Sequence, residues 1–335
     1  MESKEKFTKT YYEYFDTVTT VTGYAESKED FLKANSIIEA RLSEYHKLYD
    51  AYHSKTDAGY EESYANITNI KDINAVVGTE HVMRKVDKRI IDLLLYCKEI
   101  YELTGGETNV AMGSVLKLWH DEREFASKNP SEAKLPDPEK LEAASKHTDI
   151  NKLIIDKENS TVFISDPEMT IDVGAVAKGY AAEMIARELE AEGFDGYALS
   201  VGGNVRTVGA KPGGEKWSVG IENPTDALSP CVETVYVAGE SVVTSGSYQR
   251  YYVVDGKKYH HITDKDTLYP SEYFDSVSVI TKDSALADAL STALFSMPIE
   301  DGMALINGID GAEAIWISKS GEKHVSAGFS AYIAN

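Results

Sequence analysis

Hydrophobic residues recur every three or four positions in four stretches of the chain, which is the spacing of a helix with one buried face. The first stretch begins at Ser27, which can form a capping box with Asp30. The second ends at Gly105 and Gly106, a pair typical of a helix stop. The four predicted helices cover approximately residues 27–52, 79–103, 175–192 and 284–297.

Other stretches have the composition and spacing of strands. Residues 14–24 (YFDTVTTVTGY) are rich in Thr, Val and aromatic residues, and Leu153–Asp156 with Thr161–Ile164 predicts a hairpin. From residue 197 to 281, short Val-, Tyr- and Ser-rich runs alternate with turns that contain Gly, which indicates an antiparallel sheet. Because helices come early and strands cluster later, we predict an α+β fold rather than a regular βαβ array.

The length of 335 residues predicts two lobes, at roughly 150 residues per domain. Residues 1–13 form a polar lead, so we place the predicted domain at residues 14–335. The charged segment 125–149 contains Pro130, Pro136 and Pro138, which makes it the predicted divide between the lobes.

The charge balance limits the function. The chain has 34 Lys and Arg against 55 Asp and Glu, a formal net charge of −21. A protein that holds nucleic-acid backbone needs a basic surface, so we expect no nucleic-acid partner. An anionic ligand would require either a few well-placed cations or a metal ion.

Two cysteines, Cys97 and Cys231, lie far apart without the spacing of a zinc site. One bridge between them stays open, but two unpaired thiols are favoured. No apolar run reaches the ~18 residues of a membrane span. The N-terminus has no apolar segment of a signal peptide, so the protein is either cytoplasmic or exported by a segment absent from this sequence.

The common signatures of P-loop, Rossmann, zincin and α/β-hydrolase proteins are absent, and four other stretches could carry chemistry. In the first, residues 171–180 (IDVGAVAKGY), Lys178 stands at the start of a predicted helix, where a phosphate would be stabilised. The alternative is a tight turn with a solvated lysine. In the second, Gly202 and Gly203 either approach a ligand or simply turn a hairpin.

The third stretch contains adjacent histidines, His260 and His261. A histidine can act as a general base near neutral pH, and in a strand only one of two neighbours faces a given site. A structural role is the more common outcome for either one. In the fourth stretch, Asp288 and Thr292 share a helix face and could bind a hard cation through oxygen; the alternative is a buried, hydrogen-bonded carboxylate.

Together these motifs resemble one known family. The segments DVGAVAKGYA, SVGGNV, VTSGSYQRYY, YHHITD and ADALSTALF occur in the order of the ApbE family, the FAD:protein FMN transferases. The segments YFDTVTTVTGY, TGGETNVAMGSVLKLW and WSVGIENP extend the resemblance over about residues 14–317. It implies an α+β fold of two interlocked lobes of mainly antiparallel sheet with packed helices.

The resemblance also implies a reaction and its residues. With Mg²⁺ as cofactor and FAD as substrate, FMN would be esterified to a Thr or Ser of an acceptor protein, and AMP would leave. His261 would be the catalytic base, and the metal would be held by Asp288, Thr292 and the Ala175 carbonyl. The implied flavin and nucleotide contacts are Phe15, Tyr52, Glu107, Thr108, Asn109, Asp172, Lys178, Gly202, Gly203, Thr244, Ser245, Gly246 and Ile262.

The chain departs from the family pattern in two places. After His261 and Ile262 the family has an Asp-Pro-basic-Thr-Gly turn, where this chain has the sequence DKDTLYP at residues 264–270. Phe15, Asp16 and Thr17 stand where Met-Gly-Thr is usual. These changes affect loops around the implied site and remove none of its catalytic groups.

Two other functions use the same residues. A metal-dependent FAD pyrophosphatase would give free FMN and AMP, and a flavin carrier would bind FAD without turnover. The resemblance implies an acceptor of the FMN-binding-domain type, from a membrane redox complex or an extracellular reductase. It also implies an exported protein with a lipid anchor, although the sequence leaves a cytoplasmic location open.

Overall fold

The computed structural model describes residues 4–75, 83–224 and 229–333. The chain forms two compact units, each built from segments far apart in the sequence. Unit 1 contains the chain up to His46, Val176–Gly246 and the chain from Tyr273 onward. Unit 2 contains Lys47–Ala175 and Ser247–Glu272, so the proline-containing stretch 125–149 lies inside unit 2.

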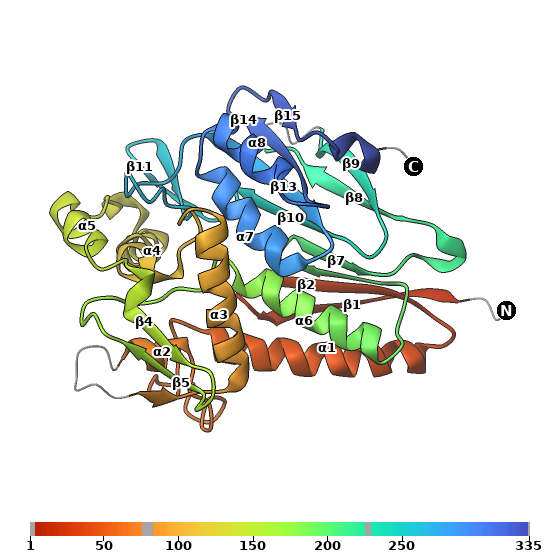
Figure 1. Ribbon diagram of the computed structural model, residues 1–335, viewed down its shortest axis with the longest axis horizontal. Coiled ribbons are helices and arrows are strands. Elements are labelled where there is room, and N and C mark those ends of the chain that lie inside the picture. The colour runs from red at the N-terminus through yellow and green to blue at the C-terminus, as the bar shows by residue number, and fades with distance from the viewer. Residues whose placement is uncertain (1–3, 76–82, 225–228, 334–335) are drawn as a thin grey trace. The chain divides into compact units, whose positions relative to one another are not determined.

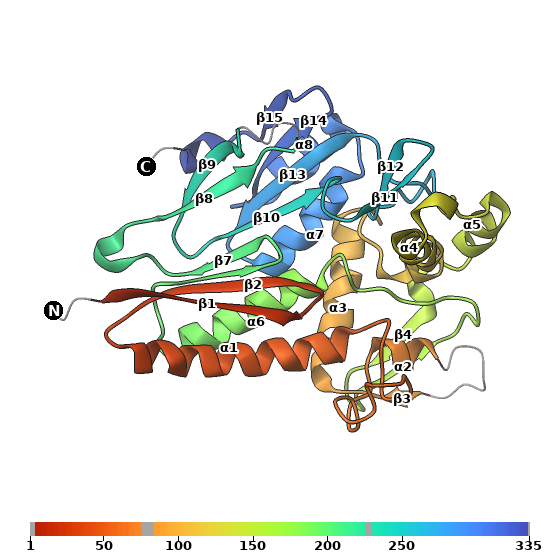
Figure 2. The ribbon, with the colours of Figure 1, turned by 180° about the vertical axis from the view of Figure 1, so that it is seen from behind.

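Unit 1 is built on an eight-stranded sheet in which every pairing is antiparallel (Figures 1 and 2). A second pair of strands, β8 and β9, closes a core around Trp217 and Phe329. In order across the large sheet, the strands are β1 (Glu5–Tyr14), β2 (Thr17–Ala25), β6 (Tyr197–Val201), β7 (Asn204–Val208), β10 (Ser241–Gly246), β13 (Phe274–Thr281), β14 (Glu313–Ser318) and β15 (Lys323–Val325), and the pair is β8 (Trp217–Glu222) with β9 (Cys231–Val237).

Helices pack on this sheet. In Figure 1, α6 and α7 lie in front of the strands, and they contact each other as well as β7, β10 and β13. The helices of unit 1 are α6 (Ala177–Ala191), α7 (Ser284–Phe295), α8 (Ile299–Asn307) and most of α1 (Lys28–Tyr49), together with the short turns η4 (Pro212–Gly214) and η5 (Phe329–Tyr332).

Unit 2 is mainly helical and packs around Trp119, whose ring lies against Tyr252, Tyr259 and Tyr269. It holds a three-stranded sheet and one hairpin. Its elements are α2 (Ile70–Asn74), β3 (Arg84–Lys85), α3 (Lys88–Leu103), η1 (Val110–Met112), α4 (Gly113–Lys128), η2 (Pro130–Glu132), α5 (Pro138–Ser145), η3 (Ile150–Lys152), β4 (Leu153–Asp156), β5 (Thr161–Ile164), β11 (Tyr251–Val254) and β12 (Lys257–His260).

The predicted α+β class is confirmed, and so are several elements. The 153–164 hairpin forms at the predicted residues. The Ser27 hydroxyl accepts the Asp30 N–H at 3.1 Å, so Ser27 caps the helix; the Asp30 carboxylate accepts the Ser27 hydroxyl at 2.6 Å, where a capping box uses the Ser27 N–H. At the predicted stop after Leu103, Gly106 N–H donates to the Tyr101 carbonyl at 2.8 Å.

Two predictions differ from the structure. The helix predicted from near residue 79 begins at Lys88, because Asp87 caps it by accepting the Arg89 N–H at 2.9 Å; the expected start lies outside the described residues. Residues 5–13, predicted as part of a polar lead, belong to β1 (Glu5–Tyr14). This strand stands at the sheet edge, where Lys and Glu are favoured, and its polar composition hid its strand character.

Cys97 is buried, Cys231 is exposed and both are free, which confirms two unpaired thiols. No helix in the described part of the chain is long and apolar enough to span a bilayer.

Candidate functional site

The predicted site residues fall into two groups, one in each compact unit. In unit 1 the structure brings together Lys178, Asp288 and Thr292 on α6 and α7, and holds α7 on β10 through Ser245. The remaining members of this group are Phe15, Gly202, Gly203, Thr244 and Gly246. Unit 2 holds Tyr52, Glu107, Thr108, Asn109, Asp172, Ala175, His261 and Ile262.

The centre of the unit 1 group is a bond between α6 and α7. The residue before α6, Val176, offers no side-chain cap, and the N–H groups of a first helical turn have no partner within the helix. Gly179 lies in that first turn, and its N–H donates to Asp288 Oδ2 at 2.7 Å. Asp288 therefore caps α6 from the middle of α7.

This bond requires glycine at position 179. A Cβ atom there would lie 2.3 Å from the Asp288 Cβ and 2.4 Å from the Ser284 carbonyl oxygen. Side chains do not approach that closely, so any larger residue would force α6 away from α7. The glycine sets the distance between Lys178 on one helix and Asp288 on the other.

Asp288 is 4% exposed, and this burial raises the pKa of its carboxyl group. The charge of Lys178, the Gly179 N–H and the amide of Asn204 act in the opposite direction. Asn204 begins β7 and is itself buried. The sequence analysis quoted Asn204 within a motif but did not propose it as a site residue.

The donor set around Asp288 fits a hard cation. Asp288 and Thr292 lie four residues apart on α7 and offer carboxylate and hydroxyl oxygens, the ligands that Mg²⁺ prefers. Within the described residues, no group of three or more His, Cys, Asp and Glu side chains could hold a metal. A cation here would keep several positions for water or phosphate, as Mg²⁺ commonly does.

Hydroxyl groups fix α7 on the sheet. Ser245 Oγ on β10 lies 2.8 Å from Ser291 Oγ, which donates to the Asp288 carbonyl at 2.9 Å. Beside it, Thr244 Oγ1 lies 2.7 Å from Ser278 Oγ on β13. Thr244 and Ser245 were predicted as nucleotide contacts; in the structure Ser245 also joins β10 to α7, and Thr244 joins β10 to β13.

Two tight turns of unit 1 carry other predicted residues. Gly202 and Gly203 turn the hairpin that connects β6 to β7, with positive φ angles of 59° and 91°, and their approach to a ligand stays a prediction. A Cβ on Gly202 would lie 2.5 Å from Thr17 Oγ1 of the neighbouring turn. That turn, Phe15–Asp16, also has positive φ angles, 56° and 50°, and Phe15 N–H donates to His46 Nδ1 at 3.1 Å.

In unit 2, Tyr52 and Asp172 are in direct contact. The Tyr52 hydroxyl donates to Asp172 Oδ2 at 2.7 Å, and Asp172 Oδ1 accepts the Gly174 N–H at 2.8 Å. Burial and the neighbouring carboxylate both raise the pKa of Tyr52, so its hydroxyl stays protonated. The carboxylate is thereby held by two donors next to Ala175.

The Tyr52 ring stacks on His120, with 4.0 Å between ring centroids and 20° between planes. Arg123 Nη2 lies 3.1 Å from His120 Nδ1. Burial and then the Arg123 charge lower the pKa of His120, which favours the neutral imidazole. His120 and Arg123 were not predicted, because nothing in the sequence places α4 beside Tyr52.

The residues Glu107, Thr108 and Asn109 form the connection between α3 and α4. Burial raises the pKa of Glu107, which is paired with Lys265 at 3.3 Å. The Thr108 N–H donates to Thr104 Oγ1 at 3.2 Å. Asn109 caps η1 by accepting the Ala111 N–H at 2.9 Å. All three therefore have structural contacts, and their flavin contacts stay a prediction.

The two histidines have different environments. His260 is 8% exposed; its Nε2 lies 2.8 Å from the Ser271 carbonyl, and its Nδ1 accepts the Ile262 N–H at 3.3 Å. His261 is more exposed, with Nδ1 lying 3.3 Å from the Arg250 carbonyl. A proton on Nδ1 of His261 would be donated to that carbonyl, which leaves the lone pair of a base on Nε2.

The loop that departs from the family pattern retains a left-handed residue. Leu268, at the place of the family's glycine, has a φ angle of 64°. Its carbonyl accepts the Trp119 Nε1–H at 2.9 Å, and the Asp264 carboxylate accepts the N–H groups of Asp266 and Thr267, both at 2.8 Å. These bonds maintain a tight turn without the usual Pro and Gly.

Comparison with known proteins agrees with this picture. A sequence model of the ApbE family matches residues 15–316. A relative from Treponema pallidum (strain Nichols), named FAD:protein FMN transferase, is 33% identical over 270 residues, which are 76% of this chain and 72% of the relative. A relative of the same name from Klebsiella pneumoniae (strain 342) is 31% identical over 290 residues, 86% and 85% of the two chains.

Solved structures give the same result. The ApbE protein of Thermotoga maritima has a TM-score of 0.83 at 27% identity, covering 99% of this chain and 100% of that one. The flavin transferase ApbE of Vibrio cholerae has a TM-score of 0.78 at 23% identity, with 98% and 99% covered, and supports the fold. The motifs, the fold and these matches agree, and the chain belongs to the ApbE family.

Proposed function

We propose that this protein is an FAD:protein FMN transferase. Its curated relatives are enzymes of that name. The observation that carries the proposal is the pairing of Asp288 with the first turn of α6, because it places a buried carboxylate beside Lys178 and Thr292 in a chain with a net charge of −21. That arrangement suits a small phosphorylated ligand and a cation.

The proposed reaction is a phosphoryl transfer. A Thr or Ser hydroxyl oxygen of the acceptor protein bonds to the FMN phosphorus of FAD, the pyrophosphate P–O bond to AMP breaks, and the hydroxyl proton passes to His261. A bound Mg²⁺ would neutralise charge on the phosphate oxygens. Asp288, Thr292 and the Ala175 carbonyl would hold it.

The remaining roles follow from the contacts of each residue. Lys178, in the first turn of α6, would bind a phosphate together with the partial positive charge of that helix end. His261 would accept the proton on Nε2, since its Nδ1 faces the Arg250 carbonyl. Tyr52 would orient Asp172 toward FAD.

Further flavin-side contacts remain part of the proposal. Phe15, the Glu107–Asn109 connection and Ile262 would lie along the flavin, and Gly202, Gly203 and Thr244–Gly246 along the nucleotide. An FMN-binding domain is the proposed acceptor, and an exported, lipid-anchored location is proposed from the family alone.

The test is an acceptor-labelling assay. The protein is mixed with FAD, Mg²⁺ and an FMN-binding acceptor domain; we expect a covalently fluorescent acceptor and one AMP released per label. AMP release without a label would contradict the transferase and identify an FAD pyrophosphatase. FAD that stays intact at saturating Mg²⁺ would identify a carrier.

A further inference from the structure

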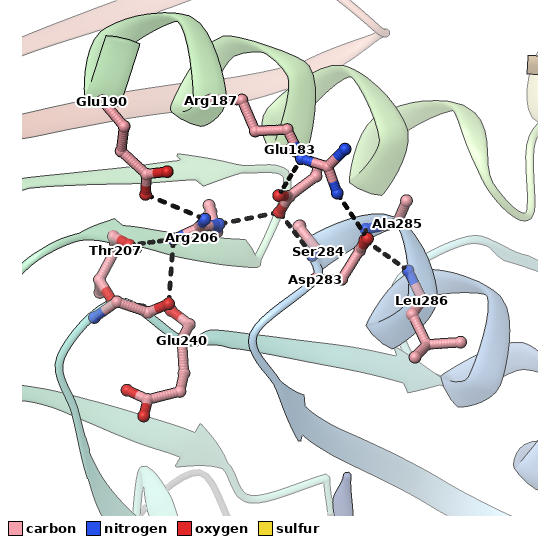
Figure 3. A network of polar contacts seen from close by, with 11 residues as sticks. Glu183, Arg187, Glu190, Arg206, Thr207, Glu240, Asp283, Ser284, Ala285 and Leu286 are labelled. Atoms are coloured by element: carbon pink, nitrogen blue, oxygen red, sulfur yellow. Dashed lines mark hydrogen bonds and ion pairs between the residues drawn. The ribbon is translucent and has the colours of Figure 1, made fainter. Parts of the chain in front are cut away.

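A buried ion pair joins α6 to β7 beside the start of α7 (Figure 3). Glu183 on α6 and Arg206 on β7 are 3% and 4% exposed, and Arg206 Nε donates to Glu183 Oε2 at 2.9 Å. Apolar residues of similar size often replace such pairs without loss of stability. Stability alone therefore does not account for this pair, and its contacts with α7 and with the sheet indicate a second role.

Glu183 caps the helix opposite its own. Its Oε2 also accepts the N–H of Ser284, the first residue of α7, at 2.9 Å. Its Oε1 accepts Arg187 Nε at 2.8 Å, and Arg187 Nη2 donates to Asp283 Oδ2, the N-cap residue of α7, at 2.9 Å. Figure 3 shows these side chains gathered between α6 and the start of α7.

Arg206 ties this carboxylate to the sheet. Its Nη2 donates to Glu190 Oε1 at 3.1 Å and its Nη1 to the Gly239 carbonyl at 3.2 Å, with a further bond to the Thr207 carbonyl. A guanidinium with this many fixed acceptors has little freedom. Glu183 is consequently held in place from the strand side as well as from α7.

The two carboxylates form a reciprocal pair of caps. Glu183 on α6 accepts an N–H from the first turn of α7, and Asp288 on α7 accepts an N–H from the first turn of α6. Glu183 lies four residues after Gly179, and Asp288 lies four residues after Ser284, so the two bonds are one helical turn apart on both helices. Each bond fixes the register that the other requires.

We infer that Glu183 is a positioning residue for the candidate cation site: it sets the register of α6 against α7 and thereby the place of the Asp288 carboxylate relative to Lys178. The cation part of this inference rests on the proposed function. Within the described structure no hydrogen bond joins Glu183 to Asp288 or Thr292, so Glu183 acts through the helix contact.

The first test is Glu183→Gln, which keeps the shape of the side chain and removes its charge. In protein labelled with ¹⁵N-glycine, we expect the Gly179 amide hydrogen to exchange with solvent about tenfold faster than in the wild type. An increase of this size is typical when a hydrogen bond to a charged group is weakened. We expect the Mg²⁺ concentration for half-maximal FAD turnover to rise several-fold, with turnover partly restored at high Mg²⁺.

Glu188→Gln is the matched control. Glu188 is also on α6 and makes a bidentate pair with Arg41 at 2.7 and 3.0 Å, but it has no bond to α7 among the described contacts. This variant should leave both the Gly179 exchange and the Mg²⁺ dependence unchanged. If Glu183→Gln and Glu188→Gln have the same Gly179 exchange rate and the same Mg²⁺ dependence, the positioning role is overturned, even when Glu183→Gln has the lower Tm.

A second variant covers the case in which Glu183→Gln does not fold. Ser284→Pro removes the N–H that Glu183 accepts, together with a hydroxyl that has no partner in the described structure; Pro is favoured at the first position of a helix, and because Ser284 is fully buried, Tm is measured alongside the exchange. Faster Gly179 exchange is expected here too, and unchanged exchange would refute the register argument. If the wild-type protein neither labels an acceptor nor cleaves FAD, the proposed function fails, while the exchange data still decide the register.

Discussion

The backbone N–H of Gly179 and the Asp288 carboxylate lie 2.7 Å apart, and this bond joins the first turn of α6 to the middle of α7. The carboxylate thus has a structural task in addition to the proposed metal task. A loss of activity after substitution of Asp288 can be assigned to metal binding only if the substitution keeps the bond to the Gly179 N–H.

Asp288→Asn separates the two tasks. Asparagine retains an oxygen that can accept the Gly179 N–H but carries no charge for a cation. We expect acceptor labelling to be lost while Tm stays near the wild-type value. Asp288→Ala removes the cap as well and should lower the free energy of unfolding by about 1–3 kcal/mol. Wild-type Mg²⁺-dependent labelling by Asp288→Asn would refute the metal assignment.

Gly179→Ala tests the close approach of the helices. The added Cβ would meet Asp288 Cβ at 2.3 Å, so we expect a destabilisation of about 1–3 kcal/mol, as for other overpacked sites. Gly302→Ala on α8 is the control, because its Cβ would meet its neighbours at an ordinary 3.4 Å. Chemical unfolding of both proteins measures the difference; equal stability would contradict the geometry at position 179.

The Glu183 cluster predicts a pH dependence of stability. Burial alone would raise the pKa of Glu183, but Arg206 and the Ser284 N–H outweigh it, and the pKa is lowered from its ordinary value. The charged form therefore stabilises the fold above the ordinary pKa, and this contribution is lost as the pH falls through the lowered one.

Burial and the charge of Glu183 raise the pKa of Asp283. Its contribution to stability therefore changes with pH in the opposite direction to that of Glu183. To isolate Glu183, the free energy of unfolding is compared between wild type and Glu183→Gln. The difference should be constant near neutral pH and shrink below about pH 4.5, the ordinary value for Glu. A difference that grows on acidification would show that the sign is wrong.

His261→Ala and His260→Ala should have distinct effects. Loss of His261 removes the proposed base and should reduce acceptor labelling at least about 100-fold with little change in FAD affinity. His260 is buried with both ring nitrogens in contact with the main chain, so His260→Ala should mainly lower Tm. FAD titration, labelling rate and thermal unfolding of each variant distinguish these outcomes; a matching loss of FAD affinity and rate in His261→Ala would assign it a structural role.

Local patterns predicted the local structure. The 153–164 hairpin and the helix cap formed by Ser27 depend on neighbouring residues, and both form at the predicted positions. β1 was not predicted, because its charged residues suit a sheet edge but dilute the alternation of a strand. Asp16 and Leu268 adopt left-handed conformations usually given to glycine, which their residue types do not indicate.

The site was harder to predict where it depends on distant contacts. The motif around Lys178 was found from its sequence, but its bond partner stands 109 positions after Gly179, and Ser284 stands 101 after Glu183. Glu183 and Arg206 belong to no motif, and their role depends on the packing of α6, α7 and β7 against one another. A single sequence contains no physical signal that these three elements pack together.

The reciprocal caps of α6 and α7 have a consequence for how this protein can change. Either helix can be exchanged alone for that of a relative only if the imported helix keeps the acceptor for the other helix's first turn. Position 179 is expected to stay glycine, whereas position 284 donates through its backbone N–H, which every residue except proline has. A chimera that imports both helices together should fold, whereas one that imports a single mismatched helix should lose the contact at its centre.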